Sequence, residues 1–237
     1  KRILLFLIEE KVLIMDKSIY HKISKDEYKT AKYVEYFTPE IHHFLKQDDK
    51  EVELPINFLE NRKKGENESR LCQIIREDLI VDFVVYVNQT NLSLFNTKIT
   101  PSIYETNLIL QSENITIIDY AFFFGSIQII EYLKTNNVEL NSSNWIYAIH
   151  SNNPEIIHIL ESNNIESNNS NQSYLDELNE SIKCHHNEIA QYIKDIYFKS
   201  EIEEFTTNAN ILLTRKVDQS SLYIQQCIIN YNFFFMK

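Results

Sequence analysis

Three stretches of the chain repeat one another, and this repetition constrains the fold more than any other feature. They cover residues 116–133, 143–160 and 176–193, and they begin about 27 and then about 33 residues apart. A period of that length is typical of helix-turn-helix solenoids, in which each unit buries its apolar face only against its neighbours. The repetition therefore predicts an all-α solenoid that presents an extended binding surface.

Each of the three repeats follows one pattern of residue types. A residue with a side-chain oxygen precedes the first helix, where it can accept from the N–H groups of the first turn. A small residue then allows neighbouring helix pairs to approach, and the second helix carries an apolar stripe at i, i+1 and i+4. The expected caps are Thr116, Ser143 and Asp176; the small residues are Ala121, Ala148 and Ser181; the stripes are Ile129, Ile130 and Leu133, then Ile156, Ile157 and Leu160, then Ile189, Ala190 and Ile193.

Asparagine takes the place of glycine where the chain has to turn. The whole sequence holds only two glycines. Asn137 and Asn164 follow second helices, whereas Asn152 and His185 occupy the position between helices that Gly125 has in the first repeat. Because asparagine tolerates the left-handed backbone conformation better than any residue except glycine, we expect these turns to be preserved.

The composition excludes two classes of function. With two glycines in 237 residues, the chain has neither the Gly-rich loop that cradles phosphates nor the Gly-x-Gly-x-x-Gly turn of dinucleotide enzymes, and we expect no cofactor. The formal net charge of −11 opposes binding to nucleic acid and to an anionic membrane surface, because its basic residues are scattered and outnumbered. The expected partner is therefore a protein, bound by a monomer.

The repeats occupy the middle of three predicted regions. Residues 1–64 show helical periodicity without a clear repeat and are expected to form an N-terminal helical cap. Residues 65–200 are expected to hold the degenerate helix-turn-helix repeats, and residues 201–237 are expected to form a C-terminal helical cap or tail. The apolar run 3–8 ends at charged residues before it reaches the length of a signal sequence, so it predicts a buried amphipathic helix.

Shorter segments between these regions also carry predictions. The polar stretch 61–69 is expected to be a linker, with a domain boundary near residue 65. Residues 71–87 form a fainter copy of the repeat, and the turn-rich insertion at 88–114 is expected to be a finger loop. The asparagine-rich stretch 163–173 is expected to be a second loop of this kind.

The cysteines indicate a reducing compartment. Cys72, Cys184 and Cys227 are odd in number, widely spaced and without a Cys-x-x-Cys pair, which favours neither a disulfide framework nor a zinc ribbon. No apolar run approaches the roughly 20 residues that a membrane-spanning helix needs. We therefore expect a cytoplasmic protein without a membrane segment.

The first repeat resembles a known pattern. Residues 116–130, Thr-Ile-Ile-Asp-Tyr-Ala-Phe-Phe-Phe-Gly-Ser-Ile-Gln-Ile-Ile, are similar to the ankyrin pattern Thr-Pro-Leu-His-Leu-Ala-Ala followed by Gly and an Ile-Val-x-x-Leu helix. Over about 24–200 the chain resembles the large ankyrin-like family of trichomonad protists that carries a domain of unknown function. The phrases that support this are residues 62–67, 101–107, 124–128 and 181–187. The resemblance implies intracellular protein binding, and it places Trp145 in the core.

The same resemblance implies where a partner would bind. Two variable positions near the end of each first helix commonly contact partners in ankyrin proteins. In this chain those positions hold Phe123, Phe124, His150, Ser151, Lys183 and Cys184. The two phenylalanines could anchor a partner, or they could pack beneath the insertion at 88–114.

A cysteine-dependent or metal-dependent hydrolase is the alternative, and a structural segment of a longer scaffold is a third reading. Cys184 could be activated by a histidine, or Cys184, His185 and His186 could bind zinc together with His150 or His158. Adjacent helical residues point about 100° apart, and the chain lacks the glycines of a typical oxyanion-hole turn. We therefore predict a protein that is not an enzyme, unless Cys184 lies within hydrogen-bond reach of a histidine in a cleft.

Overall fold

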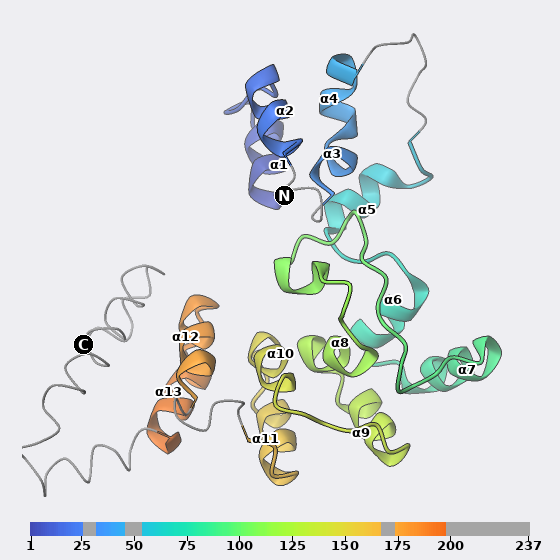
Figure 1. The fold of residues 1–237 in the computed structure, drawn as a ribbon, viewed down its shortest axis with the longest axis vertical. Coiled ribbons are helices and arrows are strands. Elements are labelled where there is room, and N and C mark those ends of the chain that lie inside the picture. Colours follow the sequence, from blue (N-terminus) through green and yellow to red (C-terminus); the bar gives the residue numbers. More distant parts are fainter. Residues whose placement is uncertain (26–31, 46–53, 167–173, 198–237) are drawn as a thin grey trace, which may run out of the picture. The chain divides into compact units, whose positions relative to one another are not determined.

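A computed structural model describes residues 1–25, 32–45, 54–166 and 174–197 (Figure 1). Within these ranges the secondary structure is helical, apart from one isolated antiparallel bridge between Lys98 and Thr116. The prediction of an all-α fold is confirmed. Contacts divide the chain into two compact units: residues 1–74 with 96–117, and residues 75–95 with those from 118 onward. The predicted C-terminal cap at 201–237 lies outside the described residues.

The first unit contains five short helices from the N-terminal region. These are α1 (Arg2–Glu9), α2 (Lys17–Ile23), α3 (Tyr33–Tyr36), α4 (Thr38–Leu45) and α5 (Phe58–Lys64). A helix does form at the start as predicted, but it is only partly buried: α1 buries Leu5, whereas the apolar Ile3 and Phe6 are exposed. Apolar side chains from α1 to α4 form one core, and its buried members are Leu5, Met15, Ile23, Tyr36, Phe37 and Ile41.

The segment 96–117, which includes most of the insertion predicted at 88–114, belongs to the first unit and does not form a finger loop. It contains the short 3-10 helix η2 (Leu108–Gln111), and it buries Ile99, Tyr104, Leu110 and Ile115. The backbone N–H and the hydroxyl of Thr106 donate to the carbonyl oxygen of Gly65 at 3.1 and 2.9 Å. The finger-loop prediction is wrong, because the apolar side chains of this segment are buried in a core, which stabilises the segment against the rest of the unit.

The stretch 61–69 is likewise structured and is not a linker. The guanidinium of Arg62 is buried in α5, where it donates to the Glu40 carboxylate at 2.8 Å and to the carbonyl oxygen of Tyr36 at 3.3 Å. Gly65 ends that helix in the left-handed conformation, with φ of 72°. Because a buried charge must be paired, Arg62 holds α5 against Glu40 and Tyr36, and the polar residues of this stretch do not form a linker. The domain boundary predicted near residue 65 falls inside the first unit and stays a prediction.

Four helix pairs follow the predicted repeats. They are α6 (Arg70–Arg76) with α7 (Ile80–Thr90), α8 (Ile117–Phe124) with α9 (Ile127–Thr135), α10 (Asn144–His150) with α11 (Pro154–Ser162), and α12 (Leu175–Lys183) with α13 (Asn187–Tyr197). The fainter copy at 71–87 therefore does form a helix pair. Residues 70–74 of α6 and the first residue of α8 belong to the first unit, and the rest of these helices belongs to the second.

The turns between the paired helices share one backbone conformation. Each has a left-handed residue two positions before its second helix. These residues are Asp78, Gly125, Asn152 and His185, with φ of 48°, 72°, 51° and 59°. Left-handed asparagines also follow the second helices α7, α9 and α11, namely Asn91, Asn137 and Asn164, with φ of 49°, 61° and 55°. The prediction that asparagine preserves the turns is confirmed.

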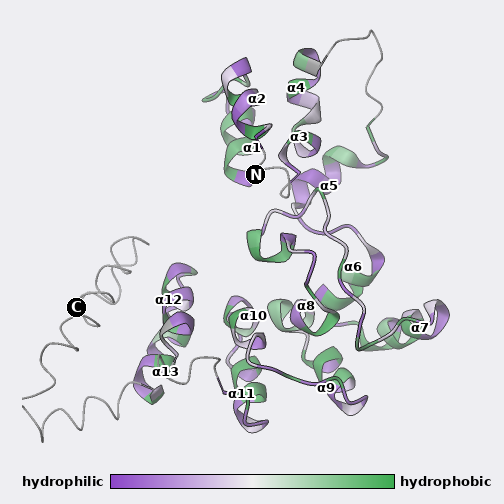
Figure 2. Ribbon diagram, in the orientation of Figure 1, coloured by the Kyte–Doolittle hydropathy of each residue, from purple (hydrophilic) through white to green (hydrophobic). Residues whose placement is uncertain are grey.

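The predicted core positions of the repeats are buried. All nine residues of the apolar stripes are at most 2% exposed, and the small residues Ala121, Ala148 and Ser181 are fully buried. Trp145 is fully buried as well, as predicted. Both hydrophobic and hydrophilic residues recur along α9 and α11, as expected of helices that bury one face (Figure 2).

Two of the three predicted helix caps are wrong. Ser143 precedes α10, but its hydroxyl donates to the side-chain oxygen of Asn141 at 2.5 Å and makes no cap hydrogen bond. Asp176 lies inside α12, which begins at Leu175 after the left-handed Tyr174. Thr116 directly precedes α8, at the predicted position. The residue types suggested caps, but a short polar side chain can also bond to the loop beside a helix, as Ser143 does with Asn141.

A carboxylate from one helix pair caps the next. Asp78, in the turn between α6 and α7, accepts from the backbone N–H groups of Gln128 and Ile129, both at 3.0 Å. These groups lie in the first turn of α9, where backbone donors have no partner within the helix. Ser126, just before α9, donates through its hydroxyl to the carbonyl oxygen of Ile75 at 2.5 Å. The start of α9 is therefore fixed by residues about 50 positions earlier.

Replacing Asp78 by glycine should destabilise the protein by about 1–2 kcal/mol, because it removes both cap hydrogen bonds and keeps a left-handed turn. Asp78→Asn retains one side-chain oxygen and should lose less. The matched control is Asn91→Gly, at another left-handed position, which should be neutral or slightly stabilising. Urea denaturation measures the three changes, and an Asp78→Gly protein as stable as Asn91→Gly would exclude this capping role.

Candidate functional site

Side chains near the ends of the first helices connect one helix pair to the next. The guanidinium of Arg76 lies 5.9 Å from the ring centre of Phe124. The ring of Phe123 stacks on that of His150, with centroids 5.0 Å apart and planes 19° apart. His150 Nε2 lies 2.9 Å from Oε1 of Glu180. These five residues, which we call the first-helix strip, join α6, α8, α10 and α12 without a break.

A buried polar contact reinforces this row of helices. The side-chain amide of Asn144, at the start of α10, donates to Oδ1 of Asp119 in α8 at 2.9 Å. The amide oxygen of Asn144 accepts from the backbone N–H of Asn141 at 2.8 Å. Asn144 is fully buried and Asp119 is 7% exposed, so this contact is shielded from water. Sequence reasoning did not single out either residue.

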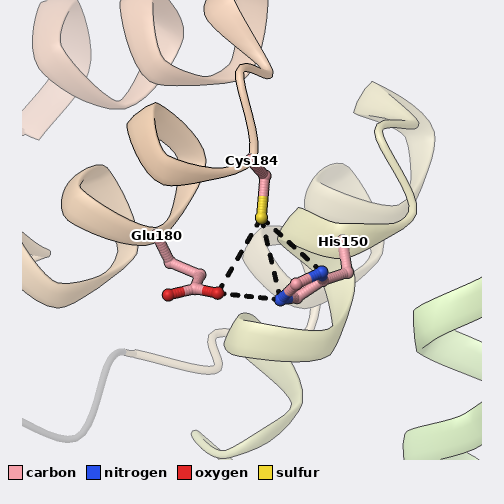
Figure 3. A group of neighbouring side chains, drawn as sticks. All are labelled: His150, Glu180 and Cys184. Atoms are coloured by element: carbon pink, nitrogen blue, oxygen red, sulfur yellow. Dashed lines mark hydrogen bonds and ion pairs between the residues drawn. The ribbon is translucent and has the colours of Figure 1, made fainter. Parts of the chain in front are cut away.

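His150, Glu180 and Cys184 form a cluster of possible metal ligands in the part of the chain that the structure describes (Figure 3). The sulfur of Cys184 lies 3.6 Å from Nδ1 and 3.8 Å from Nε2 of His150, and 3.8 Å from Oε1 of Glu180. Glu180 and Cys184 are four residues apart and lie on one side of α12 and its C-cap. His150 reaches them from α10, and all three residues are partly buried.

The electrostatics of the cluster disfavour a reactive thiolate. Burial, together with the negative charge of Glu180, raises the pKa of the Cys184 thiol to about 11. The hydrogen bond to His150, with further help from Lys183, lowers the pKa of Glu180 to about 2 despite its partial burial. The cluster therefore holds a carboxylate beside a protonated thiol, which is the reverse of a nucleophilic cysteine.

The six predicted contact residues occupy different environments. Phe123 and Phe124 are half-buried, so they are neither free anchors nor fully core residues. His150 is largely covered, with 13% of its side chain exposed, whereas Lys183 is 61% exposed and pairs with Glu180 at 3.0 Å. The hydroxyl of Ser151 donates to the carbonyl oxygen of Ala148 at 2.6 Å. Glu180 was missed, although its spacing from Lys183 and Cys184 predicted that it would contact both.

The neighbouring histidines do not converge with Cys184. His185 is exposed at the left-handed turn, and Nδ1 of His186 lies 2.8 Å from the carbonyl oxygen of Ile149. An open hollow of about 340 Å³ lies beside this turn, and its lining residues are Asn152, Pro154, His185, His186, Asn187, Glu188 and Ile189. Neither His150 nor Cys184 lines that hollow. The three adjacent residues Cys184, His185 and His186 therefore do not form the zinc site considered as an alternative.

Comparison with models of known protein families, with curated proteins and with solved structures found no match. Among the described helices, none combines the length and the apolar character that crossing a membrane requires. The helical class of the fold therefore rests on the structure itself. The resemblance to ankyrin-like proteins stays a prediction.

Cys184 should react slowly with iodoacetamide in metal-free buffer. A pKa of about 11 leaves only about one thiol in 10³ ionised at pH 8, and the higher basicity of the thiolate offsets part of that loss. Glu180→Gln should speed alkylation several-fold, because it removes the negative charge beside the sulfur. The control Glu188→Gln changes an exposed carboxylate on α13. Peptide mass spectrometry measures the rate at Cys184, and a rate equal to that of a free cysteine would support the hydrolase alternative.

Proposed function

We propose that this chain is a non-catalytic protein-binding module, an ankyrin-like solenoid related to the trichomonad family that its sequence resembles. The observation that supports it most is the first-helix strip, in which successive helix pairs contribute aromatic and charged side chains that contact one another. Stacked repeats of this kind bind partners along an extended surface and not in a deep pocket.

The exposed members of this surface are suited to protein recognition. Half-buried Phe123 is held against His150, so it would lose little conformational freedom when a partner covers it. Lys183, beside the strip, extends into solvent with 61% of its side chain exposed. An aromatic anchor flanked by charges is the usual composition of a binding hot spot. The net charge of −11 favours a partner with a basic surface.

The alternative, a cysteine hydrolase, draws on one specific observation. Cys184 lies within 3.8 Å of both ring nitrogens of His150, close enough for proton transfer. Glu180, however, lies nearer to the same imidazole, at 2.9 Å, and its charge opposes ionisation of the thiol. A nucleophilic cysteine needs a positive neighbour that stabilises the thiolate. The arrangement therefore favours binding over catalysis.

Affinity capture from the source cell, followed by quantitative mass spectrometry, tests the proposal. Phe123→Ala and Lys183→Ala should each reduce retention of the same proteins by tenfold or more, a loss of about 1.4 kcal/mol in binding free energy. The matched control, His158→Ala, alters an exposed residue of the second helix α11 and should retain them all. Circular dichroism should show that each variant is folded. Equal retention by all four proteins would contradict a binding role for the strip.

We propose further that the protein acts as a cytoplasmic monomer and binds neither nucleic acid nor membranes. The acidic charge balance and the free thiols motivate this. Analytical ultracentrifugation should give a single species near 28.2 kDa, the mass of the chain. A concentration-dependent increase in mass would contradict it.

A further inference from the structure

We propose that His150, Glu180 and Cys184 bind a divalent cation of the zinc class, and that this ion links two neighbouring helix pairs. One ligand atom from each residue lies within 4.8 Å of the others. His150 comes from the end of α10, whereas Glu180 and Cys184 come from α12 and its C-cap. A metal ion bound at this cluster would be a ligand separate from the protein partner proposed above.

The separations between the ligand atoms fit one tetrahedral ion. Zinc bonds of about 2.3 Å to sulfur and about 2.0 Å to nitrogen or oxygen place tetrahedral ligand atoms about 3.3–3.6 Å apart. With Nε2 as the His150 ligand, the sulfur of Cys184 lies 3.8 Å from that nitrogen and 3.8 Å from Oε1 of Glu180. The oxygen and Nε2 of His150 are 2.9 Å apart, because they form a hydrogen bond. Shifts of a few tenths of an ångström would turn this cluster into a coordination shell.

The donor set selects the class of metal. A thiolate and an imidazole favour zinc over magnesium or calcium, which prefer oxygen ligands. Binding breaks the S–H bond of Cys184, and the proton leaves to solvent. The thiolate and the Glu180 carboxylate then carry two negative charges, which the divalent ion neutralises in a partly buried site. One tetrahedral position remains for water.

Neighbouring side chains hold two of the ligands in position. The ring of Phe123 stacks on His150, and Nζ of Lys183 lies 3.0 Å from Oε2 of Glu180 and 3.3 Å from its Oε1. Only 13% of the His150 side chain and 14% of the Glu180 side chain are exposed. Ligands fixed by outer contacts in this way lose little freedom when a metal binds.

Cobalt(II), which adopts the same tetrahedral geometry as zinc, is the probe. Titration of the metal-free chain should give one cobalt ion per chain and a thiolate-to-cobalt charge-transfer band in the near ultraviolet. Cys184→Ser should abolish the band, whereas His150→Gln and Glu180→Gln should weaken binding at least about tenfold. Zinc should displace cobalt and raise the Tm.

Two matched variants and one independent measurement complete the test. His158→Ala removes a histidine that also pairs with a glutamate, at 3.0 Å, but is not part of this cluster. Cys227→Ser removes another cysteine of the chain, and both variants should bind cobalt as the wild type does. Zinc should also protect Cys184 of the wild-type chain from iodoacetamide, a result that does not depend on whether a variant folds. A folded wild-type chain without the band, a band that persists in Cys184→Ser, or unprotected Cys184 would each overturn the proposal.

Discussion

Replacing Ile157 by aspartate is expected to destabilise the protein by about 5 kcal/mol, the largest effect among the substitutions considered. Ile157 lies in the buried stripe of α11 with 1% of its surface exposed. The change removes apolar contacts and places an unpaired charge where water cannot reach it. For a chain of this size, thermal unfolding followed by circular dichroism should show a Tm lower by about 10–20 °C.

Val81→Asp is the matched control for this prediction. Val81 is also a β-branched residue of a second helix, but it is 73% exposed in the first turn of α7. An acidic residue in that turn interacts favourably with the helix dipole, so its cost should stay within about 0.5 kcal/mol. Similar melting temperatures for the two variants would show that the stripe of α11 is not a core element.

The repeating pattern carried enough information to predict the helix pairs and their core. Burial of Ile156, Ile157 and Leu160 follows from helical periodicity, because a stripe at i, i+1 and i+4 has to face a neighbour. The turns were equally predictable, since only a few residue types accept a left-handed backbone. Asn152 and His185 were assigned to that position from their alignment with Gly125, and both have positive φ.

Predictions that depended on distant contacts were the ones that differed from the structure. The insertion at 88–114 has the polar, turn-rich composition of an exposed loop, yet Ile99, Tyr104 and Leu110 are buried in the first unit. Asp78 is acidic like Glu77 before it, and nothing local shows that it caps a helix about 50 residues later. Such contacts arise from the fold as a whole, so short sequence patterns do not contain them.

Only part of the candidate site was predictable, because the rest depends on contacts between residues that are distant in the sequence. Cys184 and His150 were both considered, because a cysteine and a histidine from neighbouring repeats could form a nucleophile or bind zinc. Glu180 was not, since a single glutamate on a helix is most often a solvated charge. Its position four residues before Cys184 placed the two on one helix face, but only the packing of α10 against α12 brings His150 to them.

Asn144→Leu should cost about 3–4 kcal/mol, although leucine has a similar volume and is more apolar. The change removes the hydrogen bond to Asp119 at 2.9 Å and the one from the backbone N–H of Asn141 at 2.8 Å. A buried carboxylate then loses a donor that water cannot replace. The free energy of unfolding from guanidinium denaturation measures the loss, and the same substitution at exposed Asn88 in α7 should change it by less than about 0.5 kcal/mol.

A double-mutant cycle separates this polar contact from simple packing. If the hydrogen bond between α8 and α10 is the main source of the loss, the pair Asp119→Leu with Asn144→Leu should be less destabilised than the sum of the two single changes, because neither partner is left behind. If leucine at residue 144 merely fits badly, the two changes should add. Additive losses would therefore show that the cost of Asn144→Leu comes from packing. Coupling of about 1 kcal/mol or more would show that the polar bond links the first helices α8 and α10, and the first-helix strip runs across both of them.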